Sequence, residues 1–248
     1  SGSYPLVGYV PWEARTNLCL QSNAFTTTWA DSGTTAATQN VIGPDGATSA
    51  WTLTDNDAGV TEQAWQRITL TAAAYTHSYF VKKTTGAQAS YPVIYAYKAA
   101  ATSLIALATI DTSNGLATAW SAYTGITLAS GMSARCHSYD ANFWRVELTF
   151  TATAEEWTIY LAPAGVTNAT QSTGTFDIAA QGSAVFYGAQ VELGSFATPY
   201  IPTTTVAVAR NADILTYTGA DVANIKTLAC TFSRGEGIAS IGAILAAD

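Results

Sequence analysis

The chain has few charged residues for its length, and the balance of those it has is negative. Only 11% of the 248 residues are charged, 48% are hydrophobic, and the formal net charge is −7. A sparse, negative charge argues against binding to a phosphate backbone or an anionic membrane surface, so we expect neither nucleic acid nor membrane as a partner. The hydrophobic fraction is too high for a disordered chain.

Cysteine and long apolar runs are also scarce. Cys19, Cys136 and Cys230 are far apart and form no Cys-x-x-Cys pair, so neither a disulfide framework nor a zinc site is predicted. No segment reaches the roughly 18 consecutive apolar residues that a spanning helix needs. The first residues contain no basic segment followed by an apolar one, so we expect no signal peptide. Residues 1–12 carry two prolines and are predicted to form an extended lead-in.

Common catalytic motifs are missing. The sequence has no Gly-x-Ser-x-Gly elbow, no phosphate-binding loop and no His-x-x-x-His spacing. His77 and His137 are the two histidines, and we expect each on the surface or on an edge strand rather than in a catalytic role.

The carboxylates offer no evident acid and base pair. Glu155 and Glu156 are sequence neighbours, and neighbours on a strand point to opposite faces, so they are not expected to flank one glycosidic bond. Glu147 and Glu192 would need adjacent strands to act together. We therefore expect no catalytic residues and predict that the protein is not an enzyme, while a polysaccharide lyase or hydrolase is kept as the last alternative.

Short β-prone runs separated by turn residues dominate the sequence. Asn114-Gly115 is a strong hairpin signal, and Trp144 and Trp157 each lead an apolar alternating set that belongs in a core. This spacing predicts an all-β fold, a β-sandwich of two antiparallel sheets. The expected strands are 17–22, 49–54, 65–70, 77–83, 93–99, 104–110, 116–120, 143–150, 157–161, 175–178, 185–193 and 213–217.

Residues 185–193, with the sequence VFYGAQVEL, are expected to form the central strand. A period of two divides them into two faces. The inward set is predicted to be Val185, Tyr187, Ala189, Val191 and Leu193, and the outward set Phe186, Gly188, Gln190 and Glu192. The outward set is too polar to be buried by default, so it is a candidate for contact with a ligand.

The aromatic residues are the strongest functional signal. The chain has 7 tryptophans and 13 tyrosines, and several share a strand face with polar side chains. Flat rings beside hydrogen-bonding groups suit sugar rings, although aromatic residues also fill cores and protein interfaces. The candidate ligand-binding residues are Trp65, Arg67, Tyr95, Tyr97, Gln190 and Glu192.

A domain boundary is expected near Gly219. Residues 13–218 are predicted to form the sandwich. Residues 219–248 begin fresh strand-like material that is too short to bury a core alone. We predict that this short partial β segment is the start of a truncated neighbouring domain or an arm exchanged with another chain.

Several segments resemble a module found in bacteriophage tail and other virion proteins, which is similar in turn to the jelly-roll carbohydrate-binding modules appended to polysaccharide-degrading enzymes. The resemblance runs in order through residues 12–218. It is carried by WEARTNL (12–18), QSNAF (21–25), FWRV (143–146), GAQVELG (188–194), PYIPTT (199–204) and ARNAD (209–213).

This resemblance implies a jelly-roll domain that binds a cell-surface or plant-type polysaccharide without cleaving it, on a virion surface or in the extracellular space. No cofactor is required, but structural calcium is compatible, although Gln21-Ser22-Asn23 lacks the carboxylate that the enzyme-appended modules often use. Homotrimers are common among such tail proteins and are compatible with this chain, and a monomer is equally compatible with an isolated module. The alternative is a structural or adhesion domain of the particle that binds no sugar.

Overall fold

The computed structural model describes residues 12–33, 36–98 and 103–213. The chain divides into two compact units, one of residues 14–211 and one of residues 1–13 with 212–248. In the second unit, the described residues include a backbone pair in which Asp213 N donates to Trp12 O at 2.9 Å. The segment 219–248 and most of the predicted lead-in lie outside the described residues.

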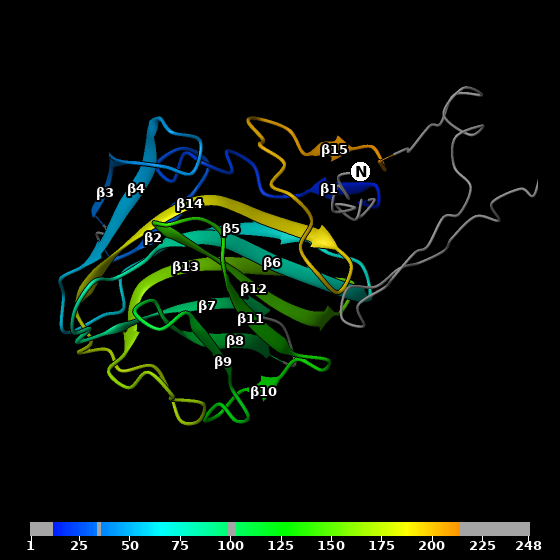
Figure 1. The fold of residues 1–248 in the computed structure, drawn as a ribbon. Coiled ribbons are helices and arrows are strands. Elements are labelled where there is room, and N and C mark those ends of the chain that lie inside the picture. The colour runs from blue at the N-terminus through cyan, green and yellow to red at the C-terminus, as the bar shows by residue number, and fades with distance from the viewer. Residues whose placement is uncertain (1–11, 34–35, 99–102, 214–248) are drawn as a thin grey trace, which may run out of the picture. The chain divides into compact units, whose positions relative to one another are not determined.

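The unit 14–211 is a β-sandwich (Figure 1). A seven-stranded sheet runs in the order β10 (Thr127–Leu128), β8 (Leu104–Asp111), β7 (Tyr91–Lys98), β13 (Glu156–Val166), β5 (Gln63–Thr69) and β2 (Ala30–Ser32), with β9 (Leu116–Ala119) paired to β8. A six-stranded sheet runs in the order β11 (Ser133–Ser138), β12 (Phe143–Ala152), β6 (Ala73–Lys82), β14 (Gly182–Leu193), β4 (Thr48–Asp55) and β3 (Ala36–Ile42). The short strands β1 (Arg15–Asn17) and β15 (Val208–Arg210) pair with each other.

The chain passes repeatedly from one sheet to the other, as in a jelly roll. Strands β4, β5, β6 and β7 alternate between the sheets, and so do β12, β13 and β14. The pairings within the two large sheets are antiparallel, apart from the two-residue strand β10, which runs parallel to β8. The predicted all-β sandwich is confirmed, with β14 in the interior of its sheet.

Local turn chemistry was a good guide to the strand pairs. The Asn114-Gly115 signal is confirmed, because β9 folds back on β8 with Leu116 opposite Asp111, and Gly115 takes a φ of 68°. Two expected strands differ from the structure, and a third, 213–217, lies outside the described residues apart from Asp213. Residues 175–178 form a loop, and only Arg15–Asn17 is a strand in the first segment, since the chain turns after it.

The core lies between the two large sheets. Trp157 is fully buried, and its ring centroid lies 5.0 Å from that of Phe150 on the facing sheet. Trp144 is half-buried at the edge of this core, where its indole N donates to Thr112 O at 2.7 Å. The expectation of a surface or edge position for His77 is wrong, because His77 lies on the interior strand β6 with none of its surface exposed.

A β-bulge at Gly188 changes which side chains of β14 point inward. The pairing with β6 shifts between Tyr187 and Gln190, and Gly188 takes a φ of 62°. The strict alternation expected for residues 185–193 therefore fails before the bulge and holds after it only for Ala189 and Val191. The inward position predicted for Leu193 is wrong, because its side chain is exposed at the end of the strand. Phe186 packs in the core and Tyr187 on the outer face, while Val191 is in the core as predicted.

Candidate ligand-binding face

The seven-stranded sheet brings most of the predicted aromatic residues together on its outer face. Tyr160 on β13 lies opposite Trp65 of β5 on one side and Tyr95 of β7 on the other. Thr158, two residues earlier on β13, lies between Arg67 and Tyr97 in the same way. Because paired strands are about 4.8 Å apart, two adjacent rows of side chains cross β5, β13 and β7.

Three rings make up the first of these rows. Tyr95 and Tyr160 are stacked with centroids 4.1 Å apart and an interplanar angle of 6°, and Tyr160 lies 6.5 Å from Trp65. Tyr95 is buried and donates from its hydroxyl to Gln63 Oε1 at 2.5 Å, whereas Trp65 and Tyr160 are half-buried. Tyr95 therefore packs against one face of the Tyr160 ring, and Trp65 and Tyr160 are the rings that a ligand could reach.

Tyr160 was missed from the sequence, although a signal was present. Trp157, Ile159 and Leu161 alternate as core residues, and all three are fully buried. The same alternation places Tyr160 on the opposite face. Tyr97, which was predicted, is half-buried beside it and donates from its hydroxyl to Ser103 Oγ at 3.3 Å.

A charged pocket adjoins the aromatic rows. It is open, has a volume of about 290 Å³, and is lined by Arg67, Glu155, Glu156 and Thr158. The Arg67 guanidinium lies 5.3 Å from the centroid of the Trp65 ring and 3.3 Å from Glu156 Oε1. The pocket therefore places positively and negatively charged hydrogen-bonding groups next to an accessible indole.

The expectation that Glu155 and Glu156 point to opposite faces is wrong at this pocket. Strand β13 begins at Glu156, so Glu155 belongs to the connection before it and does not follow the alternation of the strand. Both side chains consequently line the same pocket. Each carboxylate forms an ion pair with a basic side chain. Lys98 Nζ lies 3.1 Å from Glu155 Oε2, and Arg67 Nη1 lies 3.3 Å from Glu156 Oε1.

Aromatic residues of two loops cover the other half of this sheet face. Trp120 and Tyr123 pack with Phe176, and the Phe176 ring meets Tyr95 edge-on at 5.0 Å. The two loops are tied together by their backbones, since Thr124 N donates to Gly174 O at 2.7 Å. Trp65 and Tyr160 therefore lie next to the half of the face that these loops cover.

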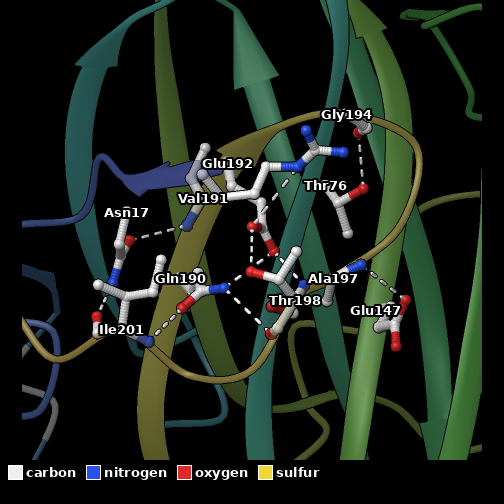
Figure 2. A network of polar contacts seen from close by, with 12 residues as sticks. Asn17, Thr76, Glu147, Gln190, Val191, Glu192, Gly194, Ala197, Thr198 and Ile201 are labelled. Atoms are coloured by element: carbon white, nitrogen blue, oxygen red, sulfur yellow. Dashed lines mark hydrogen bonds and ion pairs between the residues drawn. The ribbon is translucent and has the colours of Figure 1, made fainter. Parts of the chain in front are cut away.

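Gln190 and Glu192 have a structural role in place of the predicted ligand contact. Both are on β14 of the six-stranded sheet and have none of their surface exposed. Glu192 accepts from Thr198 N at 2.6 Å and from Thr198 Oγ1 at 2.8 Å, and Gln190 Oε1 accepts from Ile201 N at 2.8 Å (Figure 2). Their polar groups hold the segment after β14 against the sheet, so they leave the candidate binding set.

Asn17 completes this network and was not singled out from the sequence. Its amide donates to Ala189 O at 3.2 Å and to Ile201 O at 2.8 Å, and its Oδ1 accepts from Val191 N at 3.1 Å (Figure 2). The partners are more than 170 positions away in the chain, so no local pattern could have indicated them.

The other pair of carboxylates is separated in the structure. Strand β6 lies between β12, which carries Glu147, and β14, which carries Glu192. Glu147 Oε2 accepts from Ala197 N at 3.2 Å, and His137 Nδ1 on the edge strand β11 lies 3.6 Å from Glu147 Oε1. Glu147 therefore helps to hold the same covering segment.

Within residues 12–33, 36–98 and 103–213, no three or more His, Cys, Asp or Glu side chains gather where they could hold a metal ion. Structural calcium stays a prediction, since backbone carbonyls and one Asp can also supply oxygen ligands. Over the same ranges, no helix is long and apolar enough to cross a membrane. Cys19 and Cys136 are free thiols, and Cys230 lies outside the described residues.

Comparison with known proteins adds a similarity to a solved structure. No model of a protein family and no curated protein matches this chain. Among solved structures, the chain is similar to the enzymatically active domain of tailspike protein 4 of bacteriophage CBA120, with 11% identity and a TM-score of 0.39, over 72% of this chain and 21% of that one. That domain is described as enzymatically active, which stands against the prediction that this protein is not an enzyme.

Proposed function

We propose that this protein binds a polysaccharide on the outer face of the seven-stranded sheet. Trp65 and Tyr160 are the stacking platform, Tyr97 extends it, and Arg67 and Thr158 supply hydrogen bonds. The observation that carries the proposal is the register of β5, β13 and β7, which aligns half-buried rings and polar side chains in two neighbouring rows.

The chemistry of a sugar ring fits such a face. The C–H face of a pyranose packs on an aromatic ring, while its hydroxyl groups need donors and acceptors at the rim. The pocket beside Trp65 offers a guanidinium, a hydroxyl and two carboxylates for those hydroxyl groups. In line with the sequence resemblance, we place this activity in a bacteriophage tail or other virion protein, on the virion surface or outside the cell, with a homotrimer as the assembly to test.

The test is a screen of the purified protein against an array of oligosaccharides, with and without calcium, followed by titration of the strongest ligand. Trp65→Ala should weaken binding about fivefold, since one stacked aromatic contact is worth about 1 kcal/mol, and Tyr97→Ala should weaken it less. Tyr139→Ala is the matched control, because Tyr139 is also an exposed aromatic residue but packs on Phe80 of the six-stranded sheet.

Two outcomes would overturn the proposal. If the array is silent at high protein concentration, the aromatic face is an interface within the particle, and the structural or adhesion role applies. If Trp65→Ala binds as well as the parent protein, the glycan binds elsewhere. Release of new reducing ends from each bound glycan should be measured alongside, because Glu155 and Glu156 line the same pocket.

A further inference from the structure

We propose that this face selects uncharged sugar units and rejects glycans that carry carboxylates, such as polyuronates. The inference rests on the proposed function, because it concerns the ligand of the same site. It is carried by the way in which the charges around the pocket are paired.

Both cations beside the aromatic rows already hold a carboxylate. The Arg67 Nη1 atom lies 3.3 Å from Glu156 Oε1, and Lys98 Nζ lies 3.1 Å from Glu155 Oε2. The two pairs leave no net charge at the pocket, and the chain as a whole carries −7. The site therefore offers no uncompensated positive charge to an anionic sugar.

The two pairs differ in how easily they could be rearranged. The Lys98 side chain is only 6% exposed, so its ammonium group cannot turn outward to meet a ligand without leaving its packed position. Arg67 and Glu156 have side chains that are 60% and 55% exposed, so a ligand can reach both. If the carboxylate of a uronate formed an ion pair with Arg67, the Glu156 carboxylate would lose its partner and lie close to the carboxylate of the ligand. The two negative charges would then repel each other.

A neutral sugar avoids this conflict. A hydroxyl group can donate to Glu156 and accept from Arg67 at the same time, so the ion pair need not open. Because the selection is electrostatic, it should depend on the two glutamates rather than on the aromatic rings.

The experiment compares two panels of probes on the whole chain. The neutral panel is cello-, xylo-, manno-, malto- and galacto-hexaose, and the acidic panel is oligomers of galacturonate, alginate, hyaluronan and polysialic acid. The parent protein should bind members of the neutral panel only. The variants E156Q and E155Q/E156Q should gain affinity for acidic oligomers, by about threefold for each carboxylate removed at a separation of about 6 Å in water.

The control removes the same amount of charge elsewhere. Asp57 is exposed and Asp140 is half-buried, and neither lines the pocket, so D57N/D140N should leave acidic binding unchanged. The inference is overturned if the parent protein binds acidic oligomers as tightly as neutral ones, or if E156Q and E155Q/E156Q gain no more than the control. In both cases binding itself persists, whereas silence of the parent protein on both panels would overturn the proposed function instead. If loss of Glu155, the partner of Lys98, unfolds the double variant, E156Q still tests the inference because it keeps Glu155.

Discussion

Protonation of His77 should make the domain unfold more easily as the pH falls. His77 lies in the core with none of its surface exposed, and among the described residues neither ring nitrogen has a hydrogen-bond partner. Burial, with a smaller contribution from the charge on Arg145, lowers the pKa of His77 from 6.5 to about 3. Leu148 and Val191 lie opposite it on the neighbouring strands, and its ring centroid is 5.8 Å from that of Tyr79.

The size of the effect follows from this pKa. Because the folded pKa is lowered, neutral His77 favours folding fully above pH 6.5, and this contribution is lost as the pH falls towards 3. Each pH unit below 6.5 corresponds to about 1.4 kcal/mol, so lowering the pH from 8 to 5 should remove about 2 kcal/mol of unfolding free energy. That is a large part of the 5–15 kcal/mol that typically stabilises a domain.

The assay is urea unfolding between pH 8 and pH 5, followed by tryptophan fluorescence, for the parent protein and His77→Leu. Leucine fills a similar volume and cannot be protonated, so the variant should be at least as stable at pH 8 and should lose about 2 kcal/mol less on acidification. Asp55, whose pKa is raised to about 6 mainly by burial, acts in the opposite direction but is present in both proteins and cancels. A difference between the two proteins that does not change with pH would refute the reasoning.

Two further predictions concern β14. Gly188→Ala should cost about 2–4 kcal/mol in urea unfolding, because the alanine would have to keep a φ of 62° and its Cβ would lie 3.1–3.2 Å from two aromatic rings. Gly46→Ala is the control, since Gly46 has a φ of 79° but an added Cβ would meet no atom within 4 Å, and it should cost about 1–2 kcal/mol. An equal cost for both variants would show that packing at the bulge is unimportant. Glu192→Gln should cost about 1–3 kcal/mol and speed hydrogen exchange at the Thr198 amide, which donates to this carboxylate; unchanged exchange there would mean that the segment is held by other contacts.

The strands were predictable wherever local pattern and turn chemistry agreed. The alternation over residues 143–150 matches β12, with Val146, Leu148 and Phe150 buried in the core. The prediction failed on β14 because a bulge inserts one residue and exchanges the faces, and Gly188 was the only local sign of it. The position of His77 was missed because histidine is usually placed at the surface, and a core position depends on tertiary packing.

The proposed binding face could be predicted in part for the same reasons. Trp65 and Arg67 follow the alternation of one strand, and Tyr95 and Tyr97 that of another, so the shared face of each pair could be predicted. Only the pairing of β13 with both strands brings the two pairs together. Gln190 and Glu192 also follow their strand, but a segment later in the chain covers them. Burial by distant residues cannot be seen in a local pattern.

The most direct test of the account is to follow the indole N–H signals by NMR while the strongest array glycan is added. The chain has 7 tryptophans, and each contributes one indole signal. We expect the Trp65 signal to shift most and to saturate at the dissociation constant measured by titration, because its half-buried ring is on the proposed face. A glycan that shifts Trp51, which lies on the six-stranded sheet, and leaves Trp65 unmoved would contradict the assignment of the binding face.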